Sequence, residues 1–299
     1  MKRFPPVKFG RGPMQVLLGA LAFSTTGSVQ ALCMPGADAF SLGFVRAGGA
    51  GLALLLLCAL SGRLGEFRPL KSWFSWQDLG ALAGLVFFQL FFFASLGHAG
   101  VTVGTVVTIG TTPVAVGILG WVLLKERPLR TWYPATGIAL LGVGILGFSK
   151  SGGMGSSMGV GVALAVTAGC SYALFVVLGK GLVQKRPTDV LMTGFFLVTG
   201  AIIILMGLSV SDEVSLAWIF TPRGLIGAVF IALFSTAIAY VLTLNGLRTT
   251  PVALAATLAL GEPLGAAILG IFLLGEPVSV MSLTGIFLLF VSMALLGRQ

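Results

Sequence analysis

Ten long apolar segments dominate this sequence and leave few folds open to it. A helix that crosses a membrane needs about 20 mostly apolar residues, and each segment comes close to that length. Only 9% of the residues are charged, whereas a soluble domain carries about 25%. A membrane β-barrel would instead need short strands of alternating polarity. We therefore expect an all-α membrane protein with ten transmembrane helices. They are expected at residues 13–34, 39–60, 79–97, 101–124, 132–148, 158–179, 190–210, 224–244, 251–274 and 279–296.

A stretch of fourteen residues occurs twice in the chain, with an offset of 150 residues. Pro113–Glu126 and Pro263–Glu276 share seven identical positions, among them the Pro and the Glu. A Pro and a Glu coincide rarely by chance in so apolar a sequence, so the match indicates an internal duplication. We expect a first five-helix repeat at 1–149, a Gly/Ser-rich linker at 150–157 and a second five-helix repeat at 158–299.

The positive charges predict how the chain is oriented in the membrane. Lys and Arg accumulate in cytoplasmic loops. With the N-terminus in the cytoplasm, fifteen of the eighteen basic residues fall on that side, and only Arg46, Lys150 and Arg223 do not. Ten helices then place both termini in the cytoplasm. Because five is odd, the second repeat enters from the opposite side, and the two repeats are inverted as in many secondary transporters.

The net charge is +9, and the basic residues lie between the apolar segments. This position indicates contact with a membrane surface and no nucleic-acid partner. We expect a multi-pass protein of a bacterial-type inner membrane, in contact with lipid. The three cysteines lie in apolar stretches without the spacing of metal ligands, so no metal site and no cofactor are expected.

Polar side chains lie near the centres of six predicted spans, whereas 132–148 and 279–296 centre on leucines. The six spans form three pairs under the repeat, so we expect a central cavity between them. The alternative is that such hydroxyls bond to their own helix or to a neighbour. Of Phe91, Phe92 and Phe93, at most one ring is expected to face the cavity. The candidate substrate-binding residues are Ser24, Thr25, Gln89, Thr112, Ser171, Tyr172, Thr236, Tyr240 and Glu262.

Glu262 is the one acid predicted to lie deep inside a span. An ionisable group there is costly, and it is a functional hypothesis by default. We consider Glu262 a proton-coupling candidate. The alternative is a protonated side chain bonded to the carbonyl that Pro263 leaves free. His98, the sole histidine, is a second proton-coupling candidate, although a surface-turn residue is the favoured interpretation.

Three further residues have predicted roles in the helices. We expect Arg46, early in the second span, to extend to the outer interface toward Asp38. Pro113 and Pro263 are expected to kink their helices in mid-span, and we interpret them as hinges.

The chain resembles the drug/metabolite transporter superfamily, and within it the EamA-type carriers. The resemblance rests on P-V-A-V-G-I-L-G-W-V-L-L-K-E-R-P-L, on E-P-L-G-A-A-I-L-G-I-F-L-L-G-E-P-V and on Arg46 in F-V-R-A-G-G-A. It departs from the family at Thr112, where the first copy would carry Glu, and at Phe23-Ser24, where a Trp is common. It implies a ten-helix carrier formed from two five-helix repeats. In its overall appearance, and not in a specific motif, the sequence is similar to YddG-type exporters of aromatic and other neutral amino acids.

These features together predict a secondary transporter, not an enzyme. It would export small metabolites, neutral or aromatic amino acids above all, by alternating access through the central cavity. Export of drugs or other metabolites stays open, as does a membrane-embedded lipid enzyme or scramblase. An enzyme would need a cluster of catalytic groups, which one histidine and one deep acid do not supply. The sequence has no ATP-binding loop, so no ATPase subunit is implied; the expected partner is a small-molecule substrate.

Overall fold

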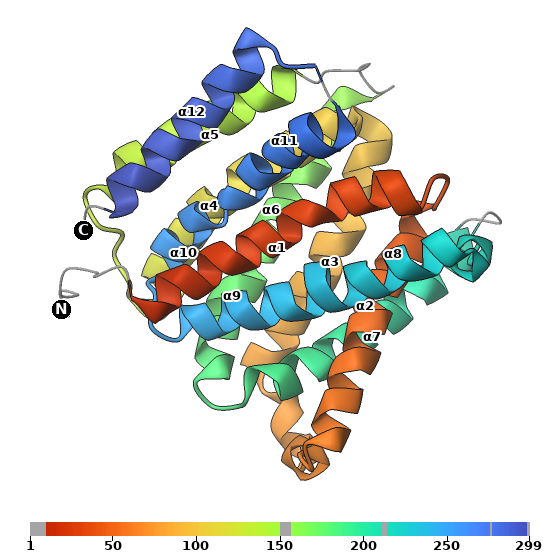
Figure 1. Cartoon of the computed structure of the whole chain (residues 1–299). Helices are drawn as coiled ribbons and strands as arrows, with labels where there is room; N and C mark the ends of the chain where they lie inside the picture. Colours follow the sequence, from red (N-terminus) through yellow and green to blue (C-terminus); the bar gives the residue numbers. More distant parts are fainter. Residues whose placement is uncertain (1–9, 150–156, 211–213, 276, 298–299) are drawn as a thin grey trace.

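The computed structural model describes residues 10–149, 157–210, 214–275 and 277–297. Within these ranges the chain forms helices and no strand (Figure 1). Apart from Ser157, the predicted linker lies outside the described residues, as does Glu276. The α-helices are α1 (Arg11–Cys33), α2 (Ala39–Leu60), α3 (Trp76–Ala99), α4 (Val101–Leu124), α5 (Trp132–Ser149), α6 (Met158–Val183), α7 (Thr188–Val210), α8 (Pro222–Ala232), α9 (Ala239–Leu247), α10 (Val252–Leu258), α11 (Gly261–Leu274) and α12 (Val280–Gly297). Shorter elements are η1 (Leu64–Phe67), η2 (Leu70–Phe74), η3 (Ala217–Phe220) and the π-helical η4 (Leu233–Ile238).

Eight helical stretches of the described chain are long and apolar enough to cross a membrane, judged by length and composition. One of them, Pro222–Leu247, combines α8, η4 and α9, and another, Val252–Leu274, combines α10 and α11. Two shorter apolar helices, Trp132–Leu146 and Val280–Leu296, correspond to the predicted fifth and tenth spans. The protein is therefore an all-helical, multi-pass membrane protein, while the number of ten crossing helices stays a prediction.

Local sequence signals account for several helix ends. The Asp38 carboxylate accepts a hydrogen bond from the Ser41 amide and caps α2, because first-turn amides have no partner within the helix. Thr221 caps α8 in the same way, and Pro222 follows at the first helical position. At their C-terminal ends, α4 and α11 both stop on a left-handed residue, Lys125 and Gly275. These two positions are 150 residues apart, so the repeated sequence ends its helix in the same way twice.

The helices pack in pairs that shape the interior. α6 contacts both α3 and α4, and α1 contacts both α9 and α11. α2 pairs with α7, and α5 pairs with α12, at opposite edges of the view in Figure 1. Glycines allow two of the closest approaches. A Cβ on Gly84 would lie 2.7 Å from the Ser171 carbonyl oxygen, and one on Gly246 would lie 2.6 Å from the Gly12 carbonyl oxygen.

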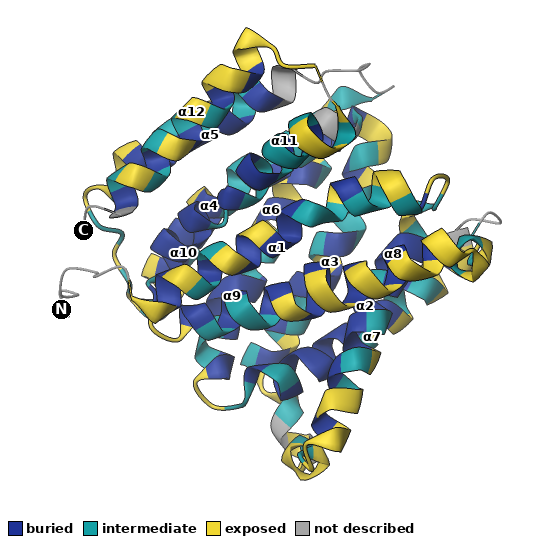
Figure 2. Ribbon diagram, in the orientation of Figure 1, coloured by how far each residue is buried: buried dark blue, intermediate teal, exposed yellow. Residues whose placement is uncertain are grey.

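Exposed positions lie along the helices (Figure 2), and many of them carry large apolar side chains. Leu60, Phe220, Phe272 and Val280 are each at least 79% exposed. In water such a surface would be unfavourable by about 25 cal/mol for each Å² of apolar area. Hydrocarbon on the outside removes that cost, so these faces suit contact with lipid.

The matching spans of the two halves differ in continuity. α4 is one helix through Pro113, whereas its counterpart is divided between α10 and α11 at Ala259–Leu260. Pro263 therefore lies in the first turn of a new helix, where its missing N–H costs little. The second half thus has a helix break near its proline and the first half does not, while a kink of α4 at Pro113 stays a prediction. Whether either proline is a hinge stays a prediction.

Candidate functional site

A cavity of about 490 Å³ lies among α1, α2, α3, α4, α6, α9 and the α10–α11 break. This volume is typical of small-molecule sites, which measure roughly 300–1,000 Å³. Among the described residues, α5, α7, α8 and α12 contribute no side chain to its wall. The lining includes six aromatic side chains and six Ser or Thr side chains: Phe23, Phe88, Phe92, Phe93, Tyr172 and Tyr240, with Ser24, Thr26, Thr105, Thr108, Thr112 and Thr243.

The cavity extends from the middle of the bundle toward one end. α2 lines it only through its first two turns, with Ala39, Leu42 and Arg46. α3 lines it through its C-terminal half, from Phe88 to Leu96. These segments border the α1–α2 and α3–α4 turns, so the cavity faces that end of the protein.

Arg46 lines this cavity, and its Nε is buried without a hydrogen-bond partner. This corrects the expectation that Arg46 extends to Asp38 at the interface. The Asp38 carboxylate instead accepts hydrogen bonds from the Ser41 amide at 2.8 Å and the Ser215 amide at 3.2 Å. Partial burial acts to raise the pKa of Asp38, but these amides outweigh it and hold the pKa below its ordinary value. Asp38 is thus occupied with the helix cap, and the Arg46 guanidinium is left facing the cavity.

Glu262 also lines the cavity, in the first turn of α11. Pro263 has no N–H to donate to the Ala259 carbonyl. This carbonyl instead accepts a hydrogen bond from the backbone N–H of Glu262 at 3.0 Å. Within the described ranges the Glu262 side chain makes no hydrogen bond or ion pair, so the alternative of a side chain held by the freed carbonyl is not what the structure has. Arg46, Tyr172 and Tyr240 line the same cavity as Glu262.

Aromatic rings form the floor of the cavity around Tyr240, which is 3% exposed. Its ring meets Phe23 edge to face with centroids 4.9 Å apart, and meets Phe196 in the same way at 5.0 Å. The centroid of the Phe175 ring lies 5.8 Å from the ring centroids of both Tyr240 and Tyr172. Edge-to-face pairs of this kind are favourable by about 0.5–1.5 kcal/mol beyond their burial. The floor therefore joins α1, α6, α7 and α9 in one packed layer.

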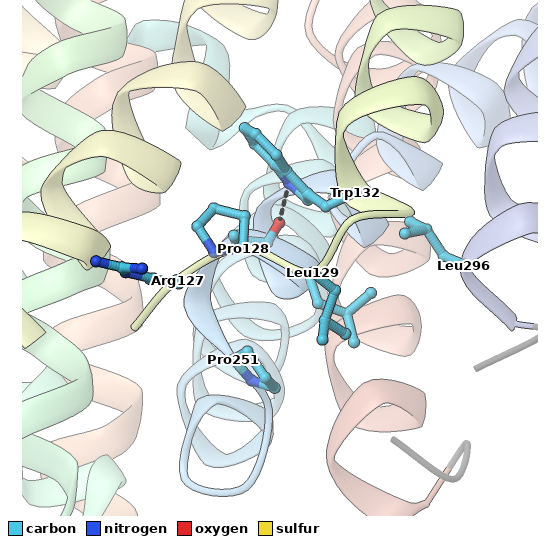
Figure 3. A pocket seen from close by; sticks show the side chains of 8 residues that line it. Arg127, Pro128, Leu129, Trp132, Pro251 and Leu296 are labelled. Atoms are coloured by element: carbon cyan, nitrogen blue, oxygen red, sulfur yellow. Dashed lines mark hydrogen bonds between the residues drawn. The ribbon is translucent and has the colours of Figure 1, made fainter. Parts of the chain in front are cut away.

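Beyond this floor, polar contacts hold the opposite end of the bundle together. Lys180 of α6 pairs with Glu126, which follows α4. Arg186 pairs with Asp78 and lies over the Trp73 ring at 4.6 Å. Figure 3 shows a small pocket at this end, where the Trp132 indole donates to the Ala253 carbonyl at 2.9 Å and so ties α5 to α10. The cavity is thus closed at the end that carries most of the basic residues.

Comparison with known proteins identifies the family of this chain. The model of the EamA-like transporter family matches residues 10–148 and again 159–298. The chain belongs to this family. The uncharacterized transporter YwfM of Bacillus subtilis (strain 168) is 34% identical over 283 residues, which cover 94% of this chain and 92% of the relative. A solved crystal structure covers 95% of both chains with a TM-score of 0.79 at 18% identity, a likeness of fold alone. The family and the relative's name indicate a transporter and not an enzyme.

In this EamA-family transporter, five of the nine predicted substrate-binding residues line the cavity, together with both prolines. They come from α1, α4, α6, α9 and α11, five elements that the fold brings around one space. Whether they bind substrate stays a prediction. The five are Ser24, Thr112, Tyr172, Tyr240 and Glu262.

The other four predicted residues lie outside the cavity wall. The Thr25 hydroxyl is 2.7 Å from the Ser235 hydroxyl and joins α1 to η4. The Ser171 hydroxyl donates to the Thr167 carbonyl at 2.8 Å, within α6. Gln89 and Thr236 are buried in α3 and η4. Thr25, Gln89 and Ser171 each lie one position along the chain from a lining residue. This is the error expected when the rotation of a helix about its axis is unknown.

His98, the second proton-coupling candidate, also lies away from the cavity wall. It is exposed near the end of α3, and its Nδ1 is 2.9 Å from the Ser157 hydroxyl. It connects α3 to the start of α6. Its part in proton coupling stays a prediction that this position does not favour.

Sequence reasoning missed three kinds of lining residue. Arg46 was assigned to the interface, and Phe88 was not singled out. Both Phe92 and Phe93 line the cavity, so the expectation of at most one ring was wrong. A usable signal was present, because Phe88 and Phe92 are four residues apart and share one helix face. Among the described residues, no group of three His, Cys, Asp or Glu side chains could hold a metal ion.

Proposed function

We propose that this transporter exports neutral amino acids, aromatic ones above all, across a bacterial inner membrane. The observation that carries the proposal is the composition of the cavity wall. It has six aromatic rings and two charged side chains of opposite sign, Arg46 and Glu262. Such a wall suits a ligand that has an apolar body and no net charge.

The same wall disfavours the other substrate classes. A phosphorylated metabolite usually needs several Arg or Lys side chains around its phosphate, and Arg46 is the one basic side chain among the lining residues described. A cationic drug would satisfy Glu262 but would leave Arg46, whose Nε is buried, without a counter-charge. A neutral amino acid offers charges to both.

We infer two inverted five-helix repeats, 1–149 and 158–299, and the helix contacts support this. Under the offset of 150, α6 corresponds to α1, α8–α9 to α3, and α10–α11 to α4. The contacts α3–α6 and α4–α6 then correspond to α9–α1 and α11–α1, and all four pairs pack. The offset also relates α2 to α7 and α5 to α12, so each of these two pairs joins an element to its own counterpart. Both pairs pack. This is the pattern of a two-fold axis, on which alternating access of inverted repeats depends.

We further propose that the closed, basic end faces the cytoplasm, with both termini there, so that this conformation faces outward. The positive-inside rule supports this orientation, since Arg63, Lys125, Lys180 and Arg248 border the closed end. Export would then require a second conformation, in which the aromatic floor around Tyr240 parts and the opposite end closes.

Glu262 is the proposed coupling site for protons. The other titratable side chains that line the same cavity are Arg46 from α2, Tyr172 from α6 and Tyr240 from α9. A carboxylate in a cavity that opens to alternate sides can pick up a proton on one side and release it on the other. Proton entry would thereby drive substrate exit.

Transport by purified protein in liposomes tests the proposal. Labelled neutral amino acids, nucleotide sugars and cationic drugs are supplied one at a time, and counterflow is measured. We expect accelerated exchange of phenylalanine, tryptophan or leucine, and none of the sugars. Exchange of sugars or drugs without any amino acid would overturn the substrate class, while exchange of nothing but lipid would favour a scramblase.

A further inference from the structure

We propose that Arg46 and Glu262 form a two-pole site for a zwitterion, in which Arg46 binds the substrate carboxylate and Glu262 binds its ammonium group. The inference rests on the proposed function, and it adds which atoms of the substrate each side chain recognises. It also assigns a binding role to Arg46, which the sequence had placed at the interface.

The state of Arg46 is the first argument. Its Nε is buried and has no hydrogen-bond partner, and the side chain lines the cavity. Leaving a buried donor unsatisfied costs about 1–3 kcal/mol, and more for a charged group. A ligand that supplies acceptors removes this cost on binding. The guanidinium is a planar fork that matches a carboxylate with two parallel hydrogen bonds, so a carboxylate is the group that fits.

The state of Glu262 is the second argument. Its side chain lines the same cavity and makes no hydrogen bond or ion pair with any described residue. Arg46 is the one basic side chain among the described residues that line this cavity, and no ion pair within the described chain joins it to Glu262. A primary ammonium group offers three donors and would compensate the carboxylate.

The relation between the two poles is the third argument. Arg46 and Glu262 line the same cavity, yet no ion pair within the described chain joins them. Each side chain therefore keeps its hydrogen-bonding capacity for a ligand placed between them. Arg46 lies on α2 of the first half and Glu262 on α11 of the second half. A bound zwitterion would connect the two halves, which is what a substrate must do to bias the movement of one against the other.

The aromatic wall completes the site. Tyr172 and Phe88 have ring centroids 4.8 Å apart, and Phe23 and Tyr240 meet at the floor. An apolar or aromatic substrate side chain gains burial there, about 25 cal/mol for each Å² removed from water. The poles thus select the amino-acid backbone and the rings select the side chain.

A series of one-pole analogues tests the site on the unaltered protein. The full chain, purified in detergent, is titrated with L-phenylalanine, with L-phenylalanine methyl ester and 2-phenylethylamine, which lack the carboxylate, and with 3-phenylpropionate, which lacks the ammonium group. We expect each analogue to bind at least about tenfold more weakly than L-phenylalanine, since a lost charged contact is worth about 1.4 kcal/mol or more. Equal binding of all four would overturn the two-pole site while leaving amino-acid transport intact.

Variants assign each pole. In Arg46→Gln the preference for L-phenylalanine over 2-phenylethylamine should collapse, while the preference over 3-phenylpropionate persists. Glu262→Gln should show the reverse. The controls are Arg223→Gln and Glu66→Gln, exposed residues outside the cavity, and both should keep the full pattern. If both preferences fall together in each variant, the poles are misassigned. If the unaltered protein binds no neutral amino acid in a wider panel, the proposed function fails and the site with it.

Discussion

The Lys180 ammonium group lies 2.5 Å from Oε1 of Glu126 and joins α6 to the C-terminal end of α4. Lys180 also donates to the Thr250 carbonyl at 2.9 Å, and the second Glu126 oxygen accepts the Val252 amide at 3.0 Å. Both charged side chains are 13% exposed. One ion pair therefore gathers α4, α6 and the α9–α10 turn at the closed end of the cavity, where Gly120 lets Val252 approach α4.

The first prediction is that breaking this pair loosens the closed end. Glu126→Gln leaves Lys180 largely buried without its counter-charge, at a cost of roughly 3 kcal/mol. In a background without Cys33, Cys58 and Cys170, a cysteine at Thr243 should react faster with a maleimide. The exchange Glu126→Lys with Lys180→Glu should restore part of the protection. An unchanged rate in Glu126→Gln would show that the aromatic floor alone closes this end.

The second prediction concerns proton coupling. Glu262→Gln keeps the shape of the side chain but cannot bind or release a proton. It should abolish accumulation driven by a pH gradient in proteoliposomes, while counterflow persists at raised substrate concentration. Glu66→Gln, at an exposed position, serves as the matched control. A variant that still accumulates substrate against its gradient would leave Glu262 without a coupling role.

The third prediction separates cavity from lipid. Thr105 and Thr112 line the cavity, whereas Leu141 is 64% exposed on α5. Cysteines at the two threonines should react with a charged, membrane-impermeant thiol reagent and be protected by substrate. A cysteine at Leu141 should not react, because lipid covers that face. Rapid labelling at position 141 would contradict the membrane assignment of α5.

The fourth prediction tests the break before Pro263. An alanine at this position has an N–H that can donate to the Ala259 carbonyl, so Pro263→Ala should join α10 to α11. We expect the maximal transport rate to fall about tenfold, equivalent to about 1.4 kcal/mol in the barrier, with little change in KM. Pro113→Ala should have a smaller effect, because α4 is already continuous. Equal effects of the two substitutions would contradict this asymmetry.

The fifth prediction concerns the Asp38 cap. Asp38→Ala should destabilise the protein by about 1 kcal/mol at neutral pH, the usual contribution of a helix cap. The pKa of Asp38 is lower in the folded protein than its ordinary value of 3.8. The charged carboxylate therefore contributes its full stabilisation above pH 3.8. This stabilisation is lost as the pH falls through the lower pKa that Asp38 has in the folded protein. Thermal unfolding of the unaltered protein and of the Asp38 variant is measured from pH 7 to pH 3. The difference between their melting temperatures should narrow at the acidic end.

The sequence alone determined the class of the protein. Segment length and the scarcity of charge specify membrane helices, because hydrocarbon accepts only backbones whose hydrogen bonds are satisfied internally. The matched Pro and Glu at an offset of 150 residues revealed the duplication. Polar residues at span centres identified the elements α1, α3, α4, α6, α9 and α11, because an unfavourable group in an apolar medium usually faces another polar surface.

The tertiary structure decided which way each side chain points. In a soluble protein the polar face of a helix marks its rotation. In a membrane, lipid and protein interior are both apolar, so α2 offers no such mark, and Arg46 could not be oriented from its sequence. The same ambiguity placed Gln89 and Ser171 in the predicted site beside Phe88 and Tyr172, the neighbours that line the cavity. The break at Ala259–Leu260 occurs in one copy of the repeat only, although both copies carry the proline, so the local sequence signal alone did not decide it.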